Sequence, residues 1–195
     1  MKAIETEYNG YRFRSRLEAR WAVFFESLGI QYEYEPEGLV LSDGTWYLPD
    51  FYLPQFNCYF EVKRAGLKGT AEGDEAIRKI RDGADHASWA GLIAFGDPVD
   101  DHLRIFCQET DDGGGGSYES IVTIGIHPIL GEPYLFAYKD RRGRAFYDSF
   151  GEDMKRIPMV TREYGTYTYE GFVDGRVLYA RKAARQARFS KGGAE

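Results

Sequence analysis

Cysteine is scarce in this chain of 195 residues, and long hydrophobic runs are missing. Cys58 and Cys107 lie far apart and form no C-x-x-C pair, so the sequence indicates neither a disulfide framework nor a cysteine zinc site. No run approaches the roughly 18 apolar residues that a membrane span requires, and the first residues include no apolar signal-peptide segment. We therefore expect a soluble cytoplasmic protein without a membrane partner.

An excess of basic charge is also missing. The chain has 25 Lys and Arg residues against 31 Asp and Glu residues, which gives a formal net charge of −6. This balance excludes a uniformly basic protein that coats nucleic acid, but it allows a locally basic face. Aromatic residues, at 16% of the chain, are frequent and favour strands around a well-filled core.

Three segments have a pattern typical of helices: residues 13–28, 74–90 and 177–189. In the first of them, apolar residues recur at i, i+4, i+7, i+8 and i+11, which is the stripe of one helix face. The segments that are typical of strands are residues 32–35, 45–53, 58–63, 92–95, 103–107, 121–126, 134–138 and 144–150.

The order of these elements is helix, three strands, helix, strand, followed by further strands and the last helix. It predicts an α/β fold with a mixed central sheet flanked by helices. Pro49 and Pro54 are expected to keep the strand at 45–53 at a sheet edge or bulge. We expect a core of residues 1–96 and a β-rich extension of residues 97–195 that ends in a helix, packed together as one globular unit.

The strand predicted for residues 58–63 carries two charged residues that can act together. Glu61 and Lys63 lie two positions apart, so their side chains project from one face of the strand while Val62 points to the other. Asp50 follows a proline at a strand bend, and Glu18 lies on the first predicted helix.

Such a set suits a hard divalent cation. Mg²⁺ takes oxygen ligands, commonly one or two carboxylates with water and substrate phosphate, so Asp50, Glu61 and the carbonyl oxygen of Val62 form a credible ligand set. A metal held there would polarise a phosphoryl oxygen and generate or orient hydroxide. Lys63 could hold the attacking water or stabilise charge on the phosphorus.

These residues resemble the PD-(D/E)XK nuclease superfamily, here Pro49-Asp50 followed by Glu61-Val62-Lys63. Within it, phage junction-resolving endonucleases and TnsA-type nucleases are most similar in pattern. They also open with an Arg-Ser-x-x-Glu helix, here FRSRLE at residues 13–18, and continue with segments similar to YEYE at 32–35 and YLPDFYLP at 47–54. The resemblance covers residues 11–95.

The resemblance implies a restriction-endonuclease-like αβββαβ core and a metal-dependent endodeoxyribonuclease that hydrolyses DNA phosphodiester bonds with Mg²⁺ or Mn²⁺. Its DNA substrate would be branched or otherwise structured, its origin would be phage-like, and it would form a homodimer where two strands are cut symmetrically.

The resemblance also implies a role for individual residues. Asp50 and Glu61 would be metal ligands, Lys63 the catalytic lysine, and Glu18 an additional acid that binds the metal directly or through water. Glu33 matches a strand acid that helps metal binding in some junction-resolving relatives. The sequence departs from the pattern after Lys63, where Arg64 stands in place of a usual glycine.

Each of these features also has a purely structural interpretation. The S-x-x-E pattern from Ser15 to Glu18 is a capping box, in which Glu18 would bond to the Ser15 amide. Asp50 could end a strand, and Glu61 with Lys63 could be an ion pair on a half-exposed strand. The corresponding alternative function is a catalytically inactive nuclease-fold binding protein, such as a phage-encoded inhibitor or a positioning subunit.

Basic residues near the proposed site and in the last helix are candidates for binding DNA. Lys and Arg side chains supply most of the sequence-independent affinity for phosphate, although a charge run alone is commonly just a solvated face. The candidates are Arg14, Arg16, Arg20, Arg64, Lys68, Arg181 and Arg185.

Overall fold

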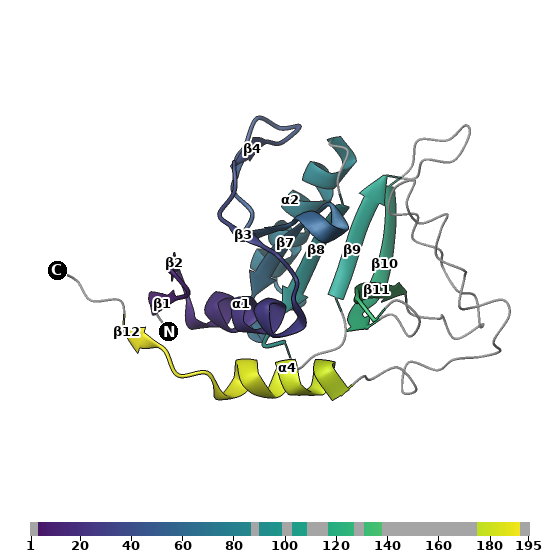
Figure 1. The fold of residues 1–195 in the computed structure, drawn as a ribbon. Coiled ribbons are helices and arrows are strands. Elements are labelled where there is room, and N and C mark those ends of the chain that lie inside the picture. The colour runs from purple at the N-terminus through teal and green to yellow at the C-terminus, as the bar shows by residue number, and fades with distance from the viewer. Residues whose placement is uncertain are drawn as a thin grey trace, which may run out of the picture.

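The computed structural model of this chain describes residues 4–86, 90–98, 103–108, 117–126, 131–137 and 175–191. Its centre is a seven-stranded sheet with the strand order β11-β10-β9-β8-β7-β6-β3 (Figure 1). The strands are β3 (Glu33–Tyr34), β6 (Phe51–Leu53), β7 (Cys58–Lys63), β8 (Ala90–Phe95), β9 (Leu103–Gln108), β10 (Ser117–Ile126) and β11 (Pro133–Ala137).

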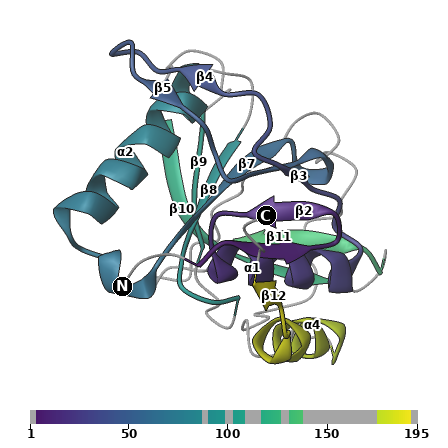
Figure 2. The same ribbon diagram turned by 90° about the vertical axis from the view of Figure 1, so that its left-hand side faces the viewer.

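The sheet is mixed, because β7 and β8 are parallel while every other neighbouring pair is antiparallel. The parallel pair is joined by helix α2 (Ala71–His86), as a crossover connection requires. Helices lie on both faces of the sheet (Figure 2), which confirms the predicted α/β fold with a mixed central sheet flanked by helices.

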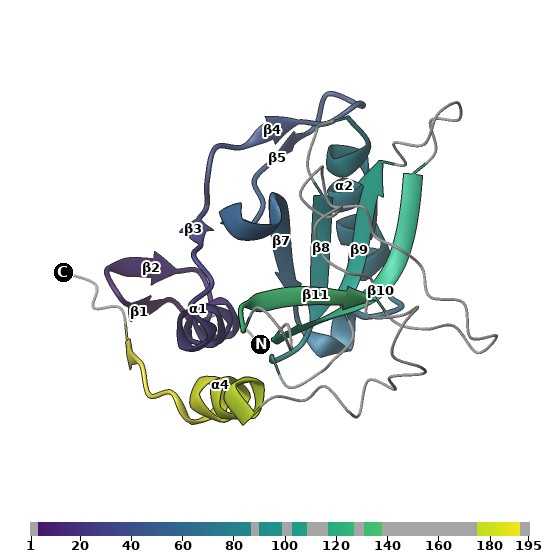
Figure 3. The same ribbon diagram turned by 45° about the vertical axis from the view of Figure 1, so that its right-hand side comes forward.

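Helix α1 (Arg16–Leu28) covers one face and begins three residues later than the sequence pattern predicts. Ser15 is its N-cap, and Gly29, with φ of 72°, ends it in the left-handed conformation that glycine adopts readily. The ring of Phe60 on β7 lies 4.8 Å from that of Trp21 and 5.1 Å from that of Phe25. Helix α4 (Gly175–Gln186) packs beside α1 and belongs to the same hydrophobic core (Figure 1 and Figure 3).

Helix α2 covers the opposite face (Figure 2). Its apolar residues Ile77, Ile80 and Ala84 form a second core with Ile93 of β8 and Phe106 of β9. Strand β8 is therefore buried on both faces, which is the reason its sequence is a continuous apolar run. Among the described residues, no helix is long and apolar enough to cross a membrane.

Two small sheets stand outside the central one. Strands β1 (Thr6–Tyr8) and β2 (Tyr11–Phe13) form a hairpin, and β12 (Ser190–Lys191) pairs antiparallel with β1. Strands β4 (Leu39–Val40) and β5 (Trp46–Tyr47) form a second hairpin. None of these was predicted as a strand of its own, although Asn9-Gly10 with φ of 46° and 80° is a tight-turn pair that favours the first hairpin.

Other predictions had mixed outcomes. The single strand expected at 45–53 is divided into β5 and β6, and β6 lies between β3 and β7, so its expected place at a sheet edge was wrong. The physical reason is that Pro49 lies before β6, so the backbone hydrogen bonds between β6 and its neighbouring strands do not need the N–H that proline lacks.

The predicted strand at 144–150 lies outside the described residues. The division into residues 1–96 and 97–195 stays a prediction. Strands β9 to β11, which lie after residue 96, belong to the same sheet as β7 and β8, which lie before it.

Candidate active site

Asp50, Glu61 and Lys63 meet where β6 begins and β7 ends. The backbone N–H of Val62 donates to Asp50 Oδ2 at 2.8 Å, and Lys63 Nζ pairs with Glu61 Oε1. The side chain of Val62 points the other way, into the core beneath α1, as strand alternation predicts. Neighbouring strands thus bring an aspartate, a glutamate and a lysine together from two segments of the sequence.

The two acids are almost completely buried. Asp50 is 3% exposed and Glu61 is 4% exposed, whereas the side chain of Lys63 is 27% exposed. Burial raises the pKa of Asp50 well above its usual value, and the negative charge of Glu61 raises it further. Burial by itself would lower the pKa of Lys63, but the charges of Glu61 and Asp50 outweigh it and raise that pKa. Lys63 is therefore a protonated ammonium group beside two crowded acids.

Glu18 is brought to the same place by the first turn of α1. Its carboxylate accepts hydrogen bonds from Ser15 Oγ at 2.6 Å, from the Arg14 amide at 3.0 Å and from Tyr34 OH at 2.7 Å. The capping interpretation expected the Ser15 amide as the donor, and the structure shows the Arg14 amide and the Ser15 hydroxyl in its place. The charge of Glu18 also raises the pKa of Asp50, so Glu18 both caps α1 and contributes to the field of the acidic pair.

Replacing the N-cap serine tests how far this helix start depends on it. We expect Ser15→Ala to lower the free energy of unfolding by about 1 kcal/mol, because the acceptor for the Glu18 amide and a donor to its carboxylate are both lost. Urea denaturation measures the change. Ser27→Ala is the matched control on the same helix, since Ser27 only bonds back to the Val23 carbonyl. Equal losses in the two variants would contradict the capping role.

Two tyrosines that the sequence did not single out hold the acids in place. Tyr47 OH donates to Glu61 Oε2 at 2.7 Å, and Tyr34 OH donates to Glu18 as described above. Burial and the charge of Glu61 raise the pKa of Tyr47 well above its usual value, so it remains a protonated donor. Glu61 thus has one oxygen held by a neutral hydroxyl, and Glu18 has both, from Ser15 and Tyr34.

Arg14 also reaches the acids. Its Nη2 lies 2.6 Å from Asp50 Oδ1, and its Nε lies 2.6 Å from Glu35 Oε1. Glu35 in turn donates its backbone N–H to the Asp50 carbonyl at 2.9 Å and has a left-handed φ of 45°. Glu35 therefore belongs to the site, although the sequence pointed to its neighbour Glu33.

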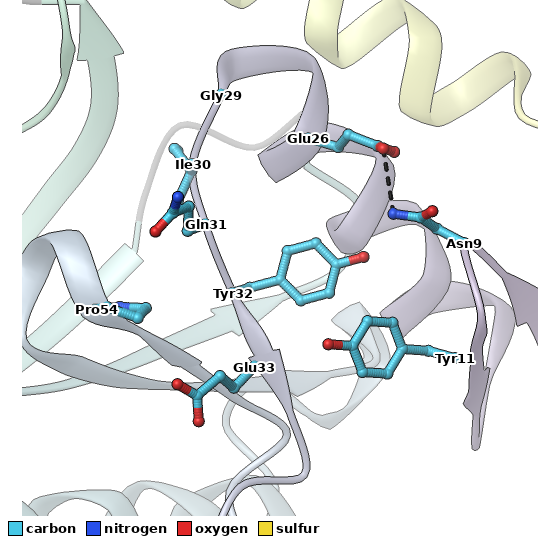
Figure 4. Close-up of a pocket in the computed structure, with 9 residues that line it drawn as sticks. All are labelled: Asn9, Tyr11, Glu26, Gly29, Ile30, Gln31, Tyr32, Glu33 and Pro54. Carbon is cyan, nitrogen blue, oxygen red and sulfur yellow. Dashed lines mark hydrogen bonds between the residues drawn. The ribbon is translucent and has the colours of Figure 1, made fainter.

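Glu33 lies elsewhere in the structure. It is exposed on β3 and lines a hollow of about 450 Å³ together with Tyr11, Tyr32 and Pro54 (Figure 4). The adjacent Tyr34 side chain turns to Glu18, and alternation along a strand sends Glu33 to the opposite side. The structure does not bring Glu33 together with Asp50 and Glu61.

The other basic candidates are distributed over three elements. Arg16 is exposed at the start of α1, and Arg20 on the same helix forms an ion pair with Asp97 at 2.7 Å. Arg64 and Lys68 are exposed on either side of the short 3₁₀ helix Ala65–Leu67, directly after β7. The two remaining candidates are on α4, where Arg181 is half-buried and Arg185 is exposed.

The oxygen donors of the site are of the kind that a hard divalent cation prefers. In the part of the chain that the structure describes, no group of three or more His, Cys, Asp or Glu side chains could hold a metal ion. Mg²⁺ needs fewer protein ligands, since one or two carboxylates with waters and substrate phosphate are enough. The two buried carboxylates of Asp50 and Glu61, with the nearby carbonyl of Val62, supply such a set.

The side chains of Asp50, Glu61, Lys63 and Glu18 thus gather at one end of β7, from three separate elements. A scan of the chain against protein-family models and a search of curated proteins both gave no match.

Proposed function

We propose that the protein is an endodeoxyribonuclease that depends on Mg²⁺ or Mn²⁺ and has a restriction-endonuclease-like PD-(D/E)XK core. The observation that supports this most is the meeting of Asp50, Glu61 and Lys63, with both acids almost completely buried. The order α1, β3, β6, β7, α2, β8 also agrees with the αβββαβ core that the sequence resemblance implies.

In this proposal Asp50 and Glu61, with the carbonyl of Val62, hold the metal. The bound metal polarises a phosphoryl oxygen and lowers the pKa of a bound water. The Lys63 ammonium group stabilises the negative charge that develops on the phosphate or holds the attacking water. Tyr47 fixes the orientation of Glu61, as partners of metal ligands commonly do.

The substrate in this proposal is DNA, and the exposed Arg64 and Lys68 beside the site attract its phosphates. Branched DNA is the first substrate to test, because of the resemblance to junction-resolving endonucleases. A homodimer would allow both strands of such a substrate to be cut symmetrically.

A cleavage assay tests the proposal. Plasmid, linear duplex and four-way-junction DNA are incubated with the protein and either Mg²⁺, Mn²⁺ or EDTA. We expect cleavage that leaves 5′-phosphate ends with either metal and none with EDTA. Lys63→Ala should slow cleavage about a hundredfold, since the positioned charge beside the reacting phosphate is lost.

Lys79→Ala is the matched control for that variant. Lys79 lies on α2 and also stands near a glutamate, with its Nζ 3.8 Å from Glu75. It should cleave at the wild-type rate. The proposal is overturned if the wild type cleaves none of the three substrates, and the assigned lysine is wrong if both variants cleave equally.

A further inference from the structure

The two buried acids share one pattern of contacts. Each has one oxygen held by a neutral donor, since Asp50 Oδ2 accepts from the Val62 amide and Glu61 Oε2 accepts from Tyr47 OH. Each has its other oxygen paired with a cation of the chain itself, Arg14 for Asp50 and Lys63 for Glu61. A metal that bound the remaining oxygens, Asp50 Oδ1 and Glu61 Oε1, would therefore meet the protein's own cations there.

These two cations differ in how firmly they are held. Lys63 projects from β7 two positions after Glu61, and its side chain is largely buried. Arg14 precedes the helix α1, and its side chain is 53% exposed. The Arg14 side chain therefore has more room to move than the Lys63 side chain.

Arg14 also has a second partner to which it can move. Its Nε contacts Glu35, whose own position is fixed by a backbone hydrogen bond to Asp50 and by a left-handed backbone that a residue with a side chain rarely adopts. The guanidinium group can therefore leave Asp50 and keep an ion pair with Glu35. A buried carboxylate that loses its cation is strongly destabilised, so a divalent cation that replaces Arg14 at Asp50 is favoured.

We propose that Arg14 is a built-in counter-ion that occupies the metal-facing oxygen of Asp50 and competes with the divalent cation for it. Metal binding releases the guanidinium group from Asp50 and leaves it on Glu35, because two positive charges at Asp50 Oδ1 repel each other. The inference rests on the proposed metal site, but it concerns metal binding and not cleavage. Its consequence is that the protein binds the metal more weakly than its two carboxylates alone would allow.

Calorimetric titration with Mn²⁺ tests the competition directly. We expect Arg14→Gln to bind Mn²⁺ about tenfold more tightly than the wild type, because the metal no longer has to break a charge-assisted hydrogen bond. Arg12→Gln is the matched control, since it changes the net charge equally but removes only an exposed ion pair with Glu5. Its affinity should stay within about twofold of the wild type, because screening weakens the effect of distant charges.

The outcomes separate this inference from the function on which it rests. If wild type and Arg14→Gln bind equally, and Glu61→Ala removes the binding, the competition is wrong and the metal site stands. If neither wild type nor Arg14→Gln binds Mn²⁺, both proposals fail.

Thermal denaturation shows whether Arg14→Gln is folded. If it is not, Arg14→Lys serves instead, because lysine lacks the rigid donor fork with which the guanidinium contacts Asp50 and Glu35 at once. It should then bind Mn²⁺ more tightly than the wild type, and equal binding would overturn the inference.

Discussion

Glu61→Gln should slow DNA cleavage about a thousandfold, since a bound metal supplies several kcal/mol of stabilisation to the transition state. The substitution should leave the fold intact. Glutamine keeps the size of the side chain, so its oxygen can still accept from Lys63 and its amide group can meet the Tyr47 hydroxyl. It lacks the negative charge that the metal requires. Single-turnover cleavage of DNA at saturating protein measures the effect.

The matched control is Glu33→Gln, the same substitution at an exposed strand acid that does not reach the cluster. We expect its cleavage rate to stay within about threefold of the wild type, as for surface changes away from the reacting groups. Thermal denaturation should show that Glu61→Gln remains folded, because glutamine keeps the volume of the side chain and the repulsion between Glu61 and Asp50 is removed. A loss of cleavage in Glu33→Gln as large as in Glu61→Gln would mean that the site is wrongly placed.

Phe51→Ala should lower the free energy of unfolding by about 3 to 5 kcal/mol, the usual range for an aromatic residue removed from a core. Phe51 follows Asp50 directly and is fully buried. Its ring centroid lies 5.4 to 6.3 Å from the rings of five neighbours, and such pairs add to the energy of burial. These neighbours are Phe13, Phe25, Tyr32, Tyr34 and Phe60.

Urea denaturation of Phe51→Ala is compared with that of Tyr179→Ala, an aromatic truncation on the surface of α4. Tyr179 is 67% exposed, so its removal should change the free energy of unfolding by no more than about 0.5 kcal/mol. If the two truncations cost the same, the aromatic cluster beneath the site does not support β6. If Phe51→Ala behaves as expected, it should also weaken the site, because β6 positions Asp50.

The elements that could be predicted from the sequence are those with a periodic apolar pattern or with residues that cap a helix. Helix α1 has an apolar stripe between Ser15 and Gly29, and β7 has the alternation that sends Glu61 and Val62 to opposite faces. Strand β8 is a plain apolar run because both of its faces are covered. In these cases the local pattern and the tertiary environment agree.

Other elements carry too little pattern to be predicted. Strands β4 and β5 have two residues each, a single period of alternation, which is too short to recognise in a sequence. There is a specific reason why Glu35, and not the predicted Glu33, lies at the site. On a regular strand the two would share a face, but Glu35 stands just after β3 with a φ of 45°, and this turn carries its side chain to Arg14. A left-handed glutamate has no signature in composition or spacing.

The pairing of β12 with β1, and of α4 with α1, joins the last described segment of the chain to the first. On the ribosome, the helix that carries Glu18 must therefore wait for residues 175–191 before it is enclosed. Contacts so distant in sequence form late and slow the folding of the whole chain. A nascent chain would thus enclose α1 only after residues 175–191 have been made, and shorter chains would present the surface of α1 that α4 covers.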